Sequence, residues 1–363
     1  MKRILILANS DIGLYNFRKE LIERLISEKN MVFISLPKGE RIKELEKIGC
    51  TFIETNVDRR GTNPIKDFKL ILKYKKILKE IKPDVVLTYT IKPNIYGGLI
   101  CRIKNIPYIC NITGLGTAVE NPSLMQKILF IMYRISLKKV KCCFVQNNEN
   151  LQFIVNNNLL EEKKCKLIPG SGVNLEHFKI LPYPKQNETI KFIFISRIME
   201  EKGINQYIEA AKIIRERYSN TEFHILGFCE QEYEEQLKKL TAEKIINYHG
   251  LQKDVIPFLQ EASCLIHPSY YPEGMSNVLL EACASGRPVI TTNRSGCREI
   301  VDDEETGYII EIKNVEQLVE KIEKFLKLSN EKREQMGLNA RKKVEKEFDR
   351  NIVIEEYIKE IGR

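Results

Sequence analysis

The sequence lacks several features that would place it in a specialised class of protein. No uninterrupted apolar run reaches the roughly 18 residues that a membrane-spanning helix needs. No two of the ten cysteines have the C-x-x-C spacing of a metal knuckle or a redox motif. Only four histidines are present, all after residue 176 and none within a turn of another. A disulfide framework and a histidine-rich metal site are therefore not expected.

What is present is an ordinary globular composition, with 43% hydrophobic and 29% charged residues. The first nine residues contain an apolar core of only five or six, shorter than the roughly 7–15 of a signal peptide. We therefore expect a first buried strand here and a cytoplasmic protein. At 363 residues the chain is too long for one compact core, so two domains are expected.

Charge is distributed unevenly between the two halves. Residues 1–175 contain 30 Lys and Arg against 16 Asp and Glu, a net charge of +14. Residues 176–363 contain 28 against 33, a net charge of −5. A basic half of this kind suits nucleic acid, an anionic membrane surface or a phosphorylated substrate.

Short apolar runs alternate with amphipathic helical segments through the whole chain. This alternation predicts an α/β protein with parallel sheets covered by helices on both faces. The pattern restarts after the loop signals near residues 170–185, so we expect two doubly wound domains with the catalytic cleft between them. The expected strands are 4–8, 31–36, 51–55, 83–89, 108–111, 142–146, 192–196, 222–226, 245–249, 264–267, 288–291 and 308–310.

The densest group of chemically useful residues lies between residues 267 and 290. A strand is expected to end at His267, and the loop after it carries Glu273. A helix begins near Ser276 or Asn277, and Glu281 follows a turn or more along it. The N–H groups at such a helix start suit a phosphate. Two carboxylates placed this way could hold hydroxyl groups on either side of a diphosphate, although Glu281 taken alone would be an ordinary solvated helix residue.

The spacing Glu273-x7-Glu281 resembles the signature of family 4 of the retaining glycosyltransferases, which have the GT-B fold of two Rossmann-like domains. Further segments follow in the family's order. They are Ile168–Asn174, Ser196–Gly203, Ile225–Gly227, His249–Leu251 and Arg287–Ile290. The resemblance implies an acceptor-binding domain over residues 1–175 and a nucleotide-sugar domain over residues 176–345, with a C-terminal helix at about 346–363 packing back on the first domain.

The resemblance also implies roles for individual residues. Glu273 contacts the donor sugar and Glu281 the nucleotide ribose, whereas Arg197 and Lys202 bind the donor diphosphate and stabilise the leaving nucleotide. Arg197, Lys202 and Glu273 are thus the expected catalytic residues. The expected donor-binding residues are Gly13, Arg197, Lys202, His249, Gly250, Leu251, Glu273, Gly274, Met275, Ser276, Asn277 and Glu281. The sequence has no D-x-D motif, so neither a metal nor another cofactor is expected.

Three segments of the first half resemble a branch of the family that acts on lipid-linked sugars in capsule, O-antigen or glycan assembly. They are Asp11–Arg18, Leu87–Gly97 and Ile112–Gly116. The acceptor-binding residues implied are Asn16, Arg18, Tyr89, Lys92 and Thr113. Many relatives carry a His at the position of Tyr89, and this half of the chain has none. Lys92 could hold an acceptor phosphate, although a lone Lys is more often a solvated surface charge.

The stretch from Met125 to Lys141 is apolar with basic residues at intervals. It resembles an interfacial helix that rests on anionic lipid. A buried helix with basic ends explains the same pattern equally well.

These observations predict a metal-independent, retaining glycosyltransferase on the cytoplasmic face of a membrane. It would move a sugar, which branch resemblance suggests is an N-acetylhexosamine, from a UDP-sugar donor to a polyprenyl-diphosphate-linked acceptor. The expected partners are these two substrates and an anionic membrane surface, without nucleic acid. Two alternatives remain: a sugar-nucleotide 2-epimerase of the same fold, for which no acid/base set of carboxylates and histidines is found, and a nonenzymatic sugar-nucleotide or nucleic-acid binder.

Overall fold

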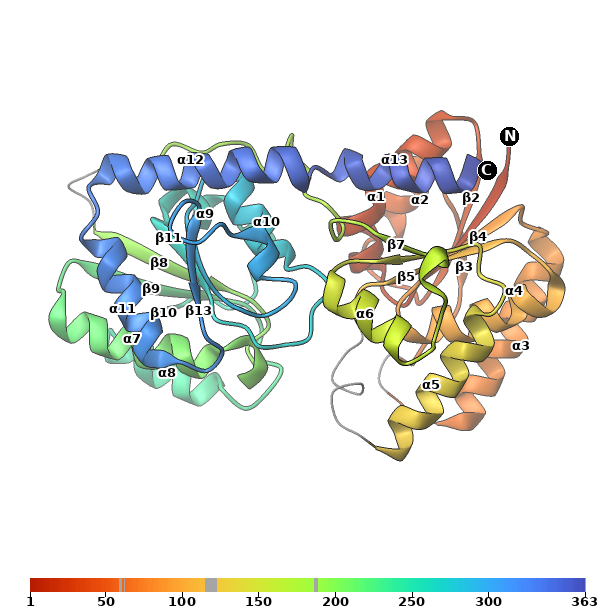
Figure 1. The fold of residues 1–363 in the computed structure, drawn as a ribbon, viewed down its shortest axis with the longest axis horizontal. Helices are drawn as coiled ribbons and strands as arrows, with labels where there is room; N and C mark the ends of the chain where they lie inside the picture. Colours follow the sequence, from red (N-terminus) through yellow and green to blue (C-terminus); the bar gives the residue numbers. More distant parts are fainter. Residues whose placement is uncertain (59–60, 62, 115–122, 186–188, 363) are drawn as a thin grey trace. The chain divides into compact units, whose positions relative to one another are not determined.

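The computed structural model describes residues 1–58, 61, 63–114, 123–185 and 189–362 (Figure 1). It divides the chain into two compact units. Unit 1 comprises Met1–Ser171 and Asn351–Arg363, and unit 2 comprises Gly172–Arg350. The first segment of unit 1 therefore ends at Ser171, four residues before the boundary at residue 175 that the sequence predicts.

Unit 1 is built on a seven-stranded parallel sheet in the order β3-β2-β1-β4-β5-β6-β7. The strands are β1 (Arg3–Leu7), β2 (Met31–Leu36), β3 (Thr51–Glu54), β4 (Val85–Tyr89), β5 (Tyr108–Ile112), β6 (Cys142–Val145) and β7 (Cys165–Leu167). Every residue of β4, β5 and β6 is buried. Strands covered on both faces read as continuous apolar runs, which is why these three could be recognised in the sequence.

Two helical layers cover this sheet. The helices of unit 1 are α1 (Asp11–Ser27), α2 (Ile42–Ile48), α3 (Pro64–Ile81), α4 (Gly98–Lys104), α5 (Leu124–Leu137), α6 (Asn148–Asn156) and α13 (Arg350–Gly362), with the short turns η1 (Pro93–Gly97) and η3 (Glu162–Lys164). Residues of α3, α4 and α5 share one core cluster, and residues of α1, α2 and α13 share another. The three helices α3, α4 and α5 therefore form one layer, and α4 contacts both of the others.

The last helix belongs to unit 1 although it lies at the end of the chain. From the sequence a helix is expected at about 346–363, whereas α13 begins at Arg350, after a break that follows Glu347. The apolar residues of α13 that enter the core are Val353, Ile354, Tyr357 and Ile361.

The chain passes between the units at two neighbouring points. Val173 donates a backbone hydrogen bond to Phe348 (2.9 Å) and accepts one from Arg350 (3.1 Å). Gly172 has a φ of +62°, and a Cβ there would lie 2.4 Å from the Cα of Arg350. A side chain at residue 172 would thus disrupt this pairing, which explains the glycine in the loop around residue 170.

Unit 2 is built on a six-stranded parallel sheet in the order β10-β9-β8-β11-β12-β13. The strands are β8 (Ile190–Ile195), β9 (Thr221–Leu226), β10 (Asn247–Tyr248), β11 (Cys264–His267), β12 (Val289–Thr292) and β13 (Gly307–Ile310). The helices are α7 (Ile204–Arg217), α8 (Glu234–Ala242), α9 (Ile256–Glu261), α10 (Asn277–Ala284), α11 (Val315–Leu326) and α12 (Asn330–Glu347), with the turns η4 (Glu200–Lys202) and η5 (Arg298–Ile300).

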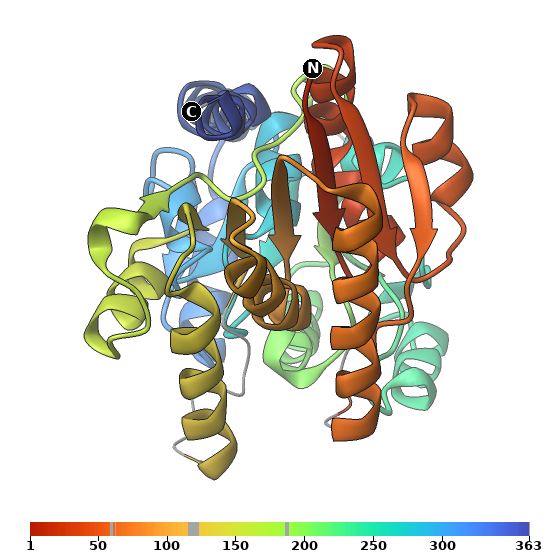
Figure 2. The same ribbon diagram turned by 90° about the vertical axis from the view of Figure 1, so that its right-hand side faces the viewer.

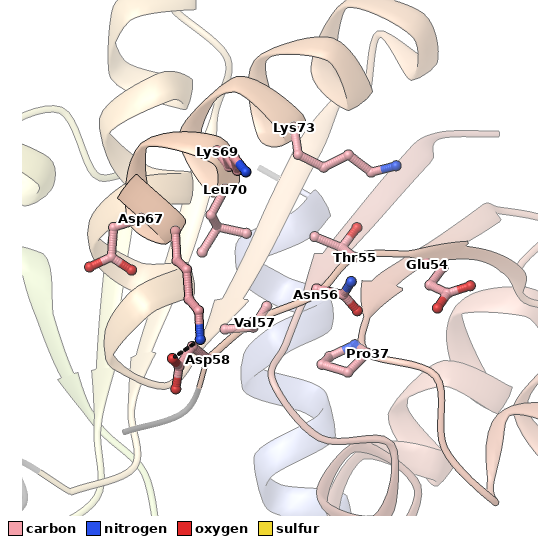
Figure 3. Close-up of a pocket in the computed structure, with 11 residues that line it drawn as sticks. Pro37, Glu54, Thr55, Asn56, Val57, Asp58, Asp67, Lys69, Leu70 and Lys73 are labelled. Atoms are coloured by element: carbon pink, nitrogen blue, oxygen red, sulfur yellow. Dashed lines mark hydrogen bonds and ion pairs between the residues drawn. The ribbon is translucent and has the colours of Figure 1, made fainter. Parts of the chain in front are cut away.

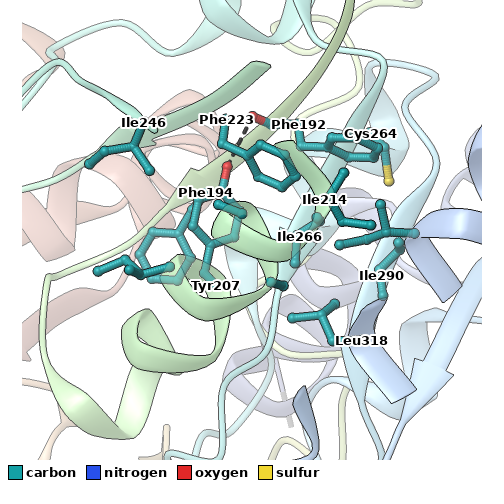
Figure 4. Close-up of a cluster of buried hydrophobic side chains, with 14 of the residues drawn as sticks. Phe192, Phe194, Tyr207, Ile214, Phe223, Ile246, Cys264, Ile266, Ile290 and Leu318 are labelled. Atoms are coloured by element: carbon teal, nitrogen blue, oxygen red, sulfur yellow. Dashed lines mark hydrogen bonds between the residues drawn. The ribbon is translucent and has the colours of Figure 1, made fainter. Parts of the chain in front are cut away.

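An aromatic cluster fills the core of unit 2 beneath α7 (Figure 4). The rings of Phe192 and Phe223 stack with centroids 5.1 Å apart, and Tyr207 lies edge-on to Phe223. The Tyr207 hydroxyl donates to the carbonyl of Phe192 (3.0 Å), so its one polar group is satisfied inside the core. This packing anchors α7, which follows directly after the turn that carries Lys202.

Candidate active site

The candidate site of unit 2 starts where β11 ends. His267 is the last residue of β11, and the loop to α10 carries Glu273. Ser276 caps α10, and its backbone N–H donates to the carbonyl of Gly296 (2.8 Å). The Ser276 hydroxyl is buried and has no hydrogen-bond partner within the described chain. A buried hydroxyl of this kind at a helix start is available for a ligand oxygen.

Lys202 and Glu273 form a buried ion pair in this loop. The Lys202 ammonium donates to Oε1 of Glu273, and the two side chains are only 8% and 14% exposed. Ser269 donates to the same oxygen (3.3 Å), and Nε2 of His267 lies 3.5 Å from it. Three polar side chains, one each from β11, the following loop and η4, thus converge on one carboxylate.

Electrostatics keep Glu273 ionised. Burial by itself would raise the pKa of Glu273, but Lys202 and then His267 outweigh it and hold this pKa well below its ordinary value. Burial lowers the pKa of His267, against the opposing effect of Glu273. The site therefore presents a fixed carboxylate beside a neutral imidazole at neutral pH.

Arg197 lies next to this ion pair. Its guanidinium donates to Oε2 of Glu230 (2.5 Å), and its Cζ lies 5.2 Å from the ring centroid of Tyr271. The ammonium of Lys202 lies 4.8 Å from the same ring. Tyr271 thus contacts both expected phosphate-binding cations and holds them on one side of the site.

Gly203 allows η4 to approach the end of β11. Its φ is +80°, and a Cβ would lie 2.2 Å from the carbonyl oxygen of Pro268. Only glycine fits this contact without moving the backbone. The glycine in the segment Ser196–Gly203 thereby sets the distance between Lys202 and the loop that carries Glu273.

Glu281 lies in α10, away from the Lys202 ion pair. Its side chain is half-buried, and burial raises its pKa to about 7, although Arg350 opposes the shift. Arg350 itself donates to the carbonyl of Gly172 (3.2 Å). Met275 and Gly274 are buried before the helix, and Asn277 is its first residue.

His249 contacts His224 through a hydrogen bond between ring nitrogens, which sequence spacing could not reveal. The two rings are parallel within 2°, and Nδ1 of His224 lies 2.9 Å from Nε2 of His249. The other ring nitrogen of His224 lies 3.1 Å from Glu222. Burial lowers the pKa of both imidazoles. His224 and His249 are 25 residues apart in the sequence, and they meet because β9 and β10 are adjacent parallel strands.

The two residues after His249 differ in exposure. Gly250 has a φ of +67°, and its carbonyl accepts from the N–H of Gly227 (2.8 Å). Leu251 is 69% exposed. An apolar side chain this exposed at the end of β10 is compatible with contact to a flat ring of a ligand.

In unit 1, Gly13 lies in the first turn of α1, where its N–H donates to the hydroxyl of Ser10 (3.2 Å). Asn16 is exposed one turn later. Thr113 is half-buried just after β5. The nearby residues Leu115 and Gly116 of the family-like segment lie outside the described residues.

Arg18 and Tyr89 are close together but buried. They are 4% and 5% exposed, and Cζ of Arg18 lies 5.0 Å from the centroid of the Tyr89 ring. Tyr357 of α13 covers them, and its hydroxyl accepts from Asn111 (2.5 Å). Both side chains are buried here, and the expected contact of Arg18 and Tyr89 with an acceptor stays a prediction.

Lys92 is neither free nor fully solvated. Its ammonium lies 2.5 Å from Oδ1 of Asp67, and both side chains are about 15% exposed. The hydroxyl of Tyr96 donates to the other oxygen of Asp67 (2.8 Å). Lys92 is therefore not the solvated surface charge that the sequence also allowed, and its expected role at an acceptor phosphate stays a prediction.

Asp67 also lines a hollow between the end of β3 and α3, with a volume of about 730 Å³ (Figure 3). Lysines from α3 and acids from both elements face it, and Lys66 pairs with Asp58 (3.2 Å). The lining is therefore of mixed charge. Its residues are Pro37, Glu54, Thr55, Asn56, Val57, Asp58, Lys66, Asp67, Lys69, Leu70 and Lys73.

Sequence reasoning missed four neighbours of the expected site residues: His267 as a contact of Glu273, Tyr271, Glu230 and Tyr357. His267 and Tyr271 were visible inside the dense segment 267–290. Glu230 and Tyr357 carry no sequence signal, because each meets its partner across the fold.

One group of residues in this site has metal-ligating side chains. Ligand atoms of His267, Glu273 and Cys297 lie within 4.8 Å of one another. Lys202 already supplies a positive charge at Glu273, and burial keeps the pKa of Cys297 far above its ordinary value. The contacts therefore favour an ion-pair site over a metal centre.

Comparison with known proteins identifies the class. The family model described as "Glycosyl transferase 4-like" matches residues 3–147, and the model "Glycosyl transferases group 1" matches residues 177–343. The chain is a glycosyltransferase with two Rossmann-like domains of the GT-B type.

Individual relatives agree with this assignment. The chain is 26% identical to the N,N'-diacetylbacillosaminyl-diphospho-undecaprenol alpha-1,3-N-acetylgalactosaminyltransferase of Campylobacter jejuni, over 98% of this chain and 97% of the relative. It is 28% identical to the UDP-Gal:alpha-D-GlcNAc-diphosphoundecaprenol alpha-1,3-galactosyltransferase of Escherichia coli, over 72% and 70%. A glycosyltransferase structure from Rickettsia africae has a TM-score of 0.82 at 22% identity and covers 99% and 97% of the two chains. The protein belongs to the glycosyltransferase family defined by the 4-like and group 1 domains.

Among the described residues, no helix combines the length and the apolar character needed to cross a lipid bilayer.

Proposed function

We propose that the protein transfers an N-acetylhexosamine from a UDP-sugar to a sugar carried on a polyprenyl diphosphate, with retention of anomeric configuration. The observation that carries the proposal is the convergence of Arg197, Lys202 and Glu273 around Tyr271 in front of α10. Both relatives are named for alpha-linked transfer to diphospho-undecaprenol-linked sugars, which supports the acceptor class and the stereochemistry.

In this proposal the donor diphosphate lies between Arg197 and Lys202. Charge grows on the leaving diphosphate as its bond to the sugar breaks, so two fixed cations stabilise the transition state more than the ground state. Glu273 holds the Lys202 ammonium in place and binds a hydroxyl of the donor sugar. Glu281 binds the ribose, and His249, Gly250 and Leu251 line the base pocket.

The chemical step needs no base from the protein. The acceptor oxygen attacks the anomeric carbon on the face from which UDP leaves, and the bond from that carbon to the diphosphate breaks. The proton of the acceptor hydroxyl passes to the departing phosphate oxygen, so UDP and the lengthened glycan leave as products. This route suits a site whose one nearby imidazole, His267, is 1% exposed.

On the acceptor side we propose that Asn16 and Thr113 face the substrate, and that Gly13 lies against the donor. Arg18 and Tyr89 are buried, and their contact with the acceptor stays a prediction. The enzyme would work at the cytoplasmic face of the membrane, held there in part by its basic first half.

The test has two stages. Purified protein is first screened against a panel of nucleotide sugars by thermal shift, because a ligand that binds only the folded state raises its unfolding temperature. The best donor is then incubated with a short-chain polyprenyl-diphosphate-linked N-acetylhexosamine, transfer is followed by mass spectrometry, and the anomeric configuration of the product is determined by NMR. Product formation with inverted configuration, or the absence of product with every donor of the panel, would refute the proposal.

A further inference from the structure

The layer formed by α3, α4 and α5 carries an unusual share of exposed apolar side chains. Of the 18 large hydrophobic residues that are exposed in the described chain, nine lie in this layer. They are Ile65, Phe68, Leu72, Ile103, Leu124, Met125, Ile128, Ile131 and Ile135. Single exposed apolar residues are ordinary, but a concentration on one layer marks an interaction surface.

On α5 the exposed apolar residues form a continuous ridge. Leu124, Ile128, Ile131 and Ile135 follow one another at helical spacing and are 75%, 43%, 52% and 44% exposed. The opposite side of α5 is buried through Tyr133, Ser136 and Leu137. The ridge therefore points away from the core, which rules out the buried helix that the sequence also allowed.

The first half of α3 also has exposed apolar residues on one face and buried residues on another. Ile65, Phe68 and Leu72 are 66%, 60% and 48% exposed at helical spacing, while Leu70 and Tyr74 enter the core. Within unit 1, α3 and α5 run lengthwise on the same side of the sheet (Figure 2). Both ridges thus lie on the helical layer formed by α3, α4 and α5.

Charge on this surface indicates what covers it. The helices α3, α4 and α5 contain ten Lys and Arg residues against two acids, Asp67 and Glu80. On α5, the basic residues Lys127 and Arg134 flank the apolar ridge on one side. Two copies of so basic a surface would repel each other, whereas an anionic lipid surface attracts it.

We propose that the ridges of α3 and α5 insert together into the interfacial region of an anionic bilayer, with exposed lysines of these helices, such as Lys127, at the headgroups. The proposal deepens the function proposed above, on which it rests for the lipid-linked acceptor. It differs from attraction by charge alone, because it requires apolar side chains to enter the acyl boundary.

The absence of tryptophan from the chain allows a direct test. Single tryptophans are introduced as Phe68→Trp on α3 and Ile131→Trp on α5. The matched control is Ile352→Trp on α13, whose side chain is 39% exposed on a helix outside this layer. Each protein is mixed with vesicles of phosphatidylglycerol and phosphatidylethanolamine, with or without brominated acyl chains.

With vesicles, emission from residues 68 and 131 should shift to shorter wavelength and be quenched by the brominated chains, and emission from residue 352 should do neither. Quenching of the control to the same extent, or of neither reporter on α3 and α5, would overturn the proposal. A concentration-dependent dimer in light scattering that disappears in Ile131→Ser would overturn it as well, because a second copy would then cover the ridge.

A second experiment removes the ridge. The double variant Ile128→Ser, Ile131→Ser should lose vesicle affinity by about tenfold for each isoleucine, whereas the control Met31→Ser, Ile352→Ser should bind as the wild type. Transfer to a short-chain acceptor in solution should be unchanged in both. If the ridge variant binds vesicles as the wild type does, membrane insertion is refuted and the proposed function is not affected. If the wild type fails to transfer sugar to the short-chain acceptor, the proposed function is refuted and membrane insertion is not affected.

Discussion

Lys202 and Glu273, 71 residues apart, form an ion pair that is almost fully enclosed in unit 2. The contact depends on Gly203, which lets η4 approach the loop after β11, and on Tyr271, whose ring covers the ammonium. In the proposed function the pair holds Lys202 where the leaving diphosphate gains charge. The carboxylate would then act both on the donor sugar and on the lysine.

Replacing the lysine tests this assignment. We expect Lys202→Ala to lower kcat by about a hundredfold or more, the effect of removing one preorganised charge donor. Lys313→Ala is the matched control, since Lys313 also lies over a tyrosine ring, that of Tyr270, but outside the cluster around Glu273. Steady-state kinetics at saturating donor provide the measurement. Near-normal turnover of Lys202→Ala would remove Lys202 from the phosphate site.

Glu281 should affect donor binding more than the chemical step. Its proposed partner is the ribose, which changes little during transfer, so Glu281→Ala should raise the KM for the donor and leave kcat close to that of the wild type. A large fall in kcat at unchanged KM would contradict the ribose assignment.

The same residue should make stability depend on pH. The pKa of Glu281 is about 7 in the folded protein, against 4.5 as its ordinary value. Between pH 4.5 and about 7 the folded protein therefore binds more protons than the unfolded chain. The unfolding free energy that the neutral Glu281 carboxyl contributes is lost as the pH rises through about 7. Without donor, Glu281→Gln should unfold at a higher temperature than the wild type at pH 8, and at the same temperature below pH 4.5. Equal unfolding temperatures at pH 8 would show that burial does not strain the ionised carboxylate.

Gly203 should tolerate no side chain. In Gly203→Ala the new Cβ would meet the backbone oxygen of Pro268, and we expect a loss of unfolding free energy above about 2 kcal/mol together with weaker donor binding. Gly250→Ala is the control, because its φ is also positive but its Cβ would have open space. That variant should lose about 1 kcal/mol. Urea denaturation compares the two, and equal losses would show that the contact with Pro268 does not matter.

Charge on the helical layer should govern recruitment to anionic vesicles. We expect the change of Lys76, Lys127 and Lys138 together to Gln to weaken binding, since each lysine near an anionic surface contributes roughly 1 kcal/mol. The three side chains are exposed. Lys141 is left unchanged because its ammonium donates to the carbonyl of Glu360 (2.6 Å) and so supports the fold.

The control for this experiment removes the same charge elsewhere, by changing Lys238, Lys239 and Lys253 of unit 2 to Gln. Co-sedimentation is measured at low and high salt, which screens such attraction within about 10 Å. Equal losses in the two triple variants, or equal binding of the wild type to neutral vesicles, would show that the lysines of unit 1 have no special role.

The order of strands and helices follows from local sequence. Parallel strands covered on both faces must be apolar along their length, and helices must alternate with them, so strands such as β4 and β11 are visible as short apolar runs. The segment from Glu273 to Glu281 is also local, because the loop and the start of α10 that carry it are contiguous in the chain. These features make the GT-B fold and the glycosyltransferase class predictable from the sequence.

Contacts between distant segments were decided only by the tertiary structure. The contact of His224 with His249 depends on the register of β9 against β10. The burial of Arg18 depends on a helix more than 300 residues away, which brings Tyr357 over it. The exposed ridge of α5 has an amphipathic pattern that is the same whether its apolar face points inward or outward. Which face is covered depends on what packs against the helix, and sequence periodicity does not carry that information.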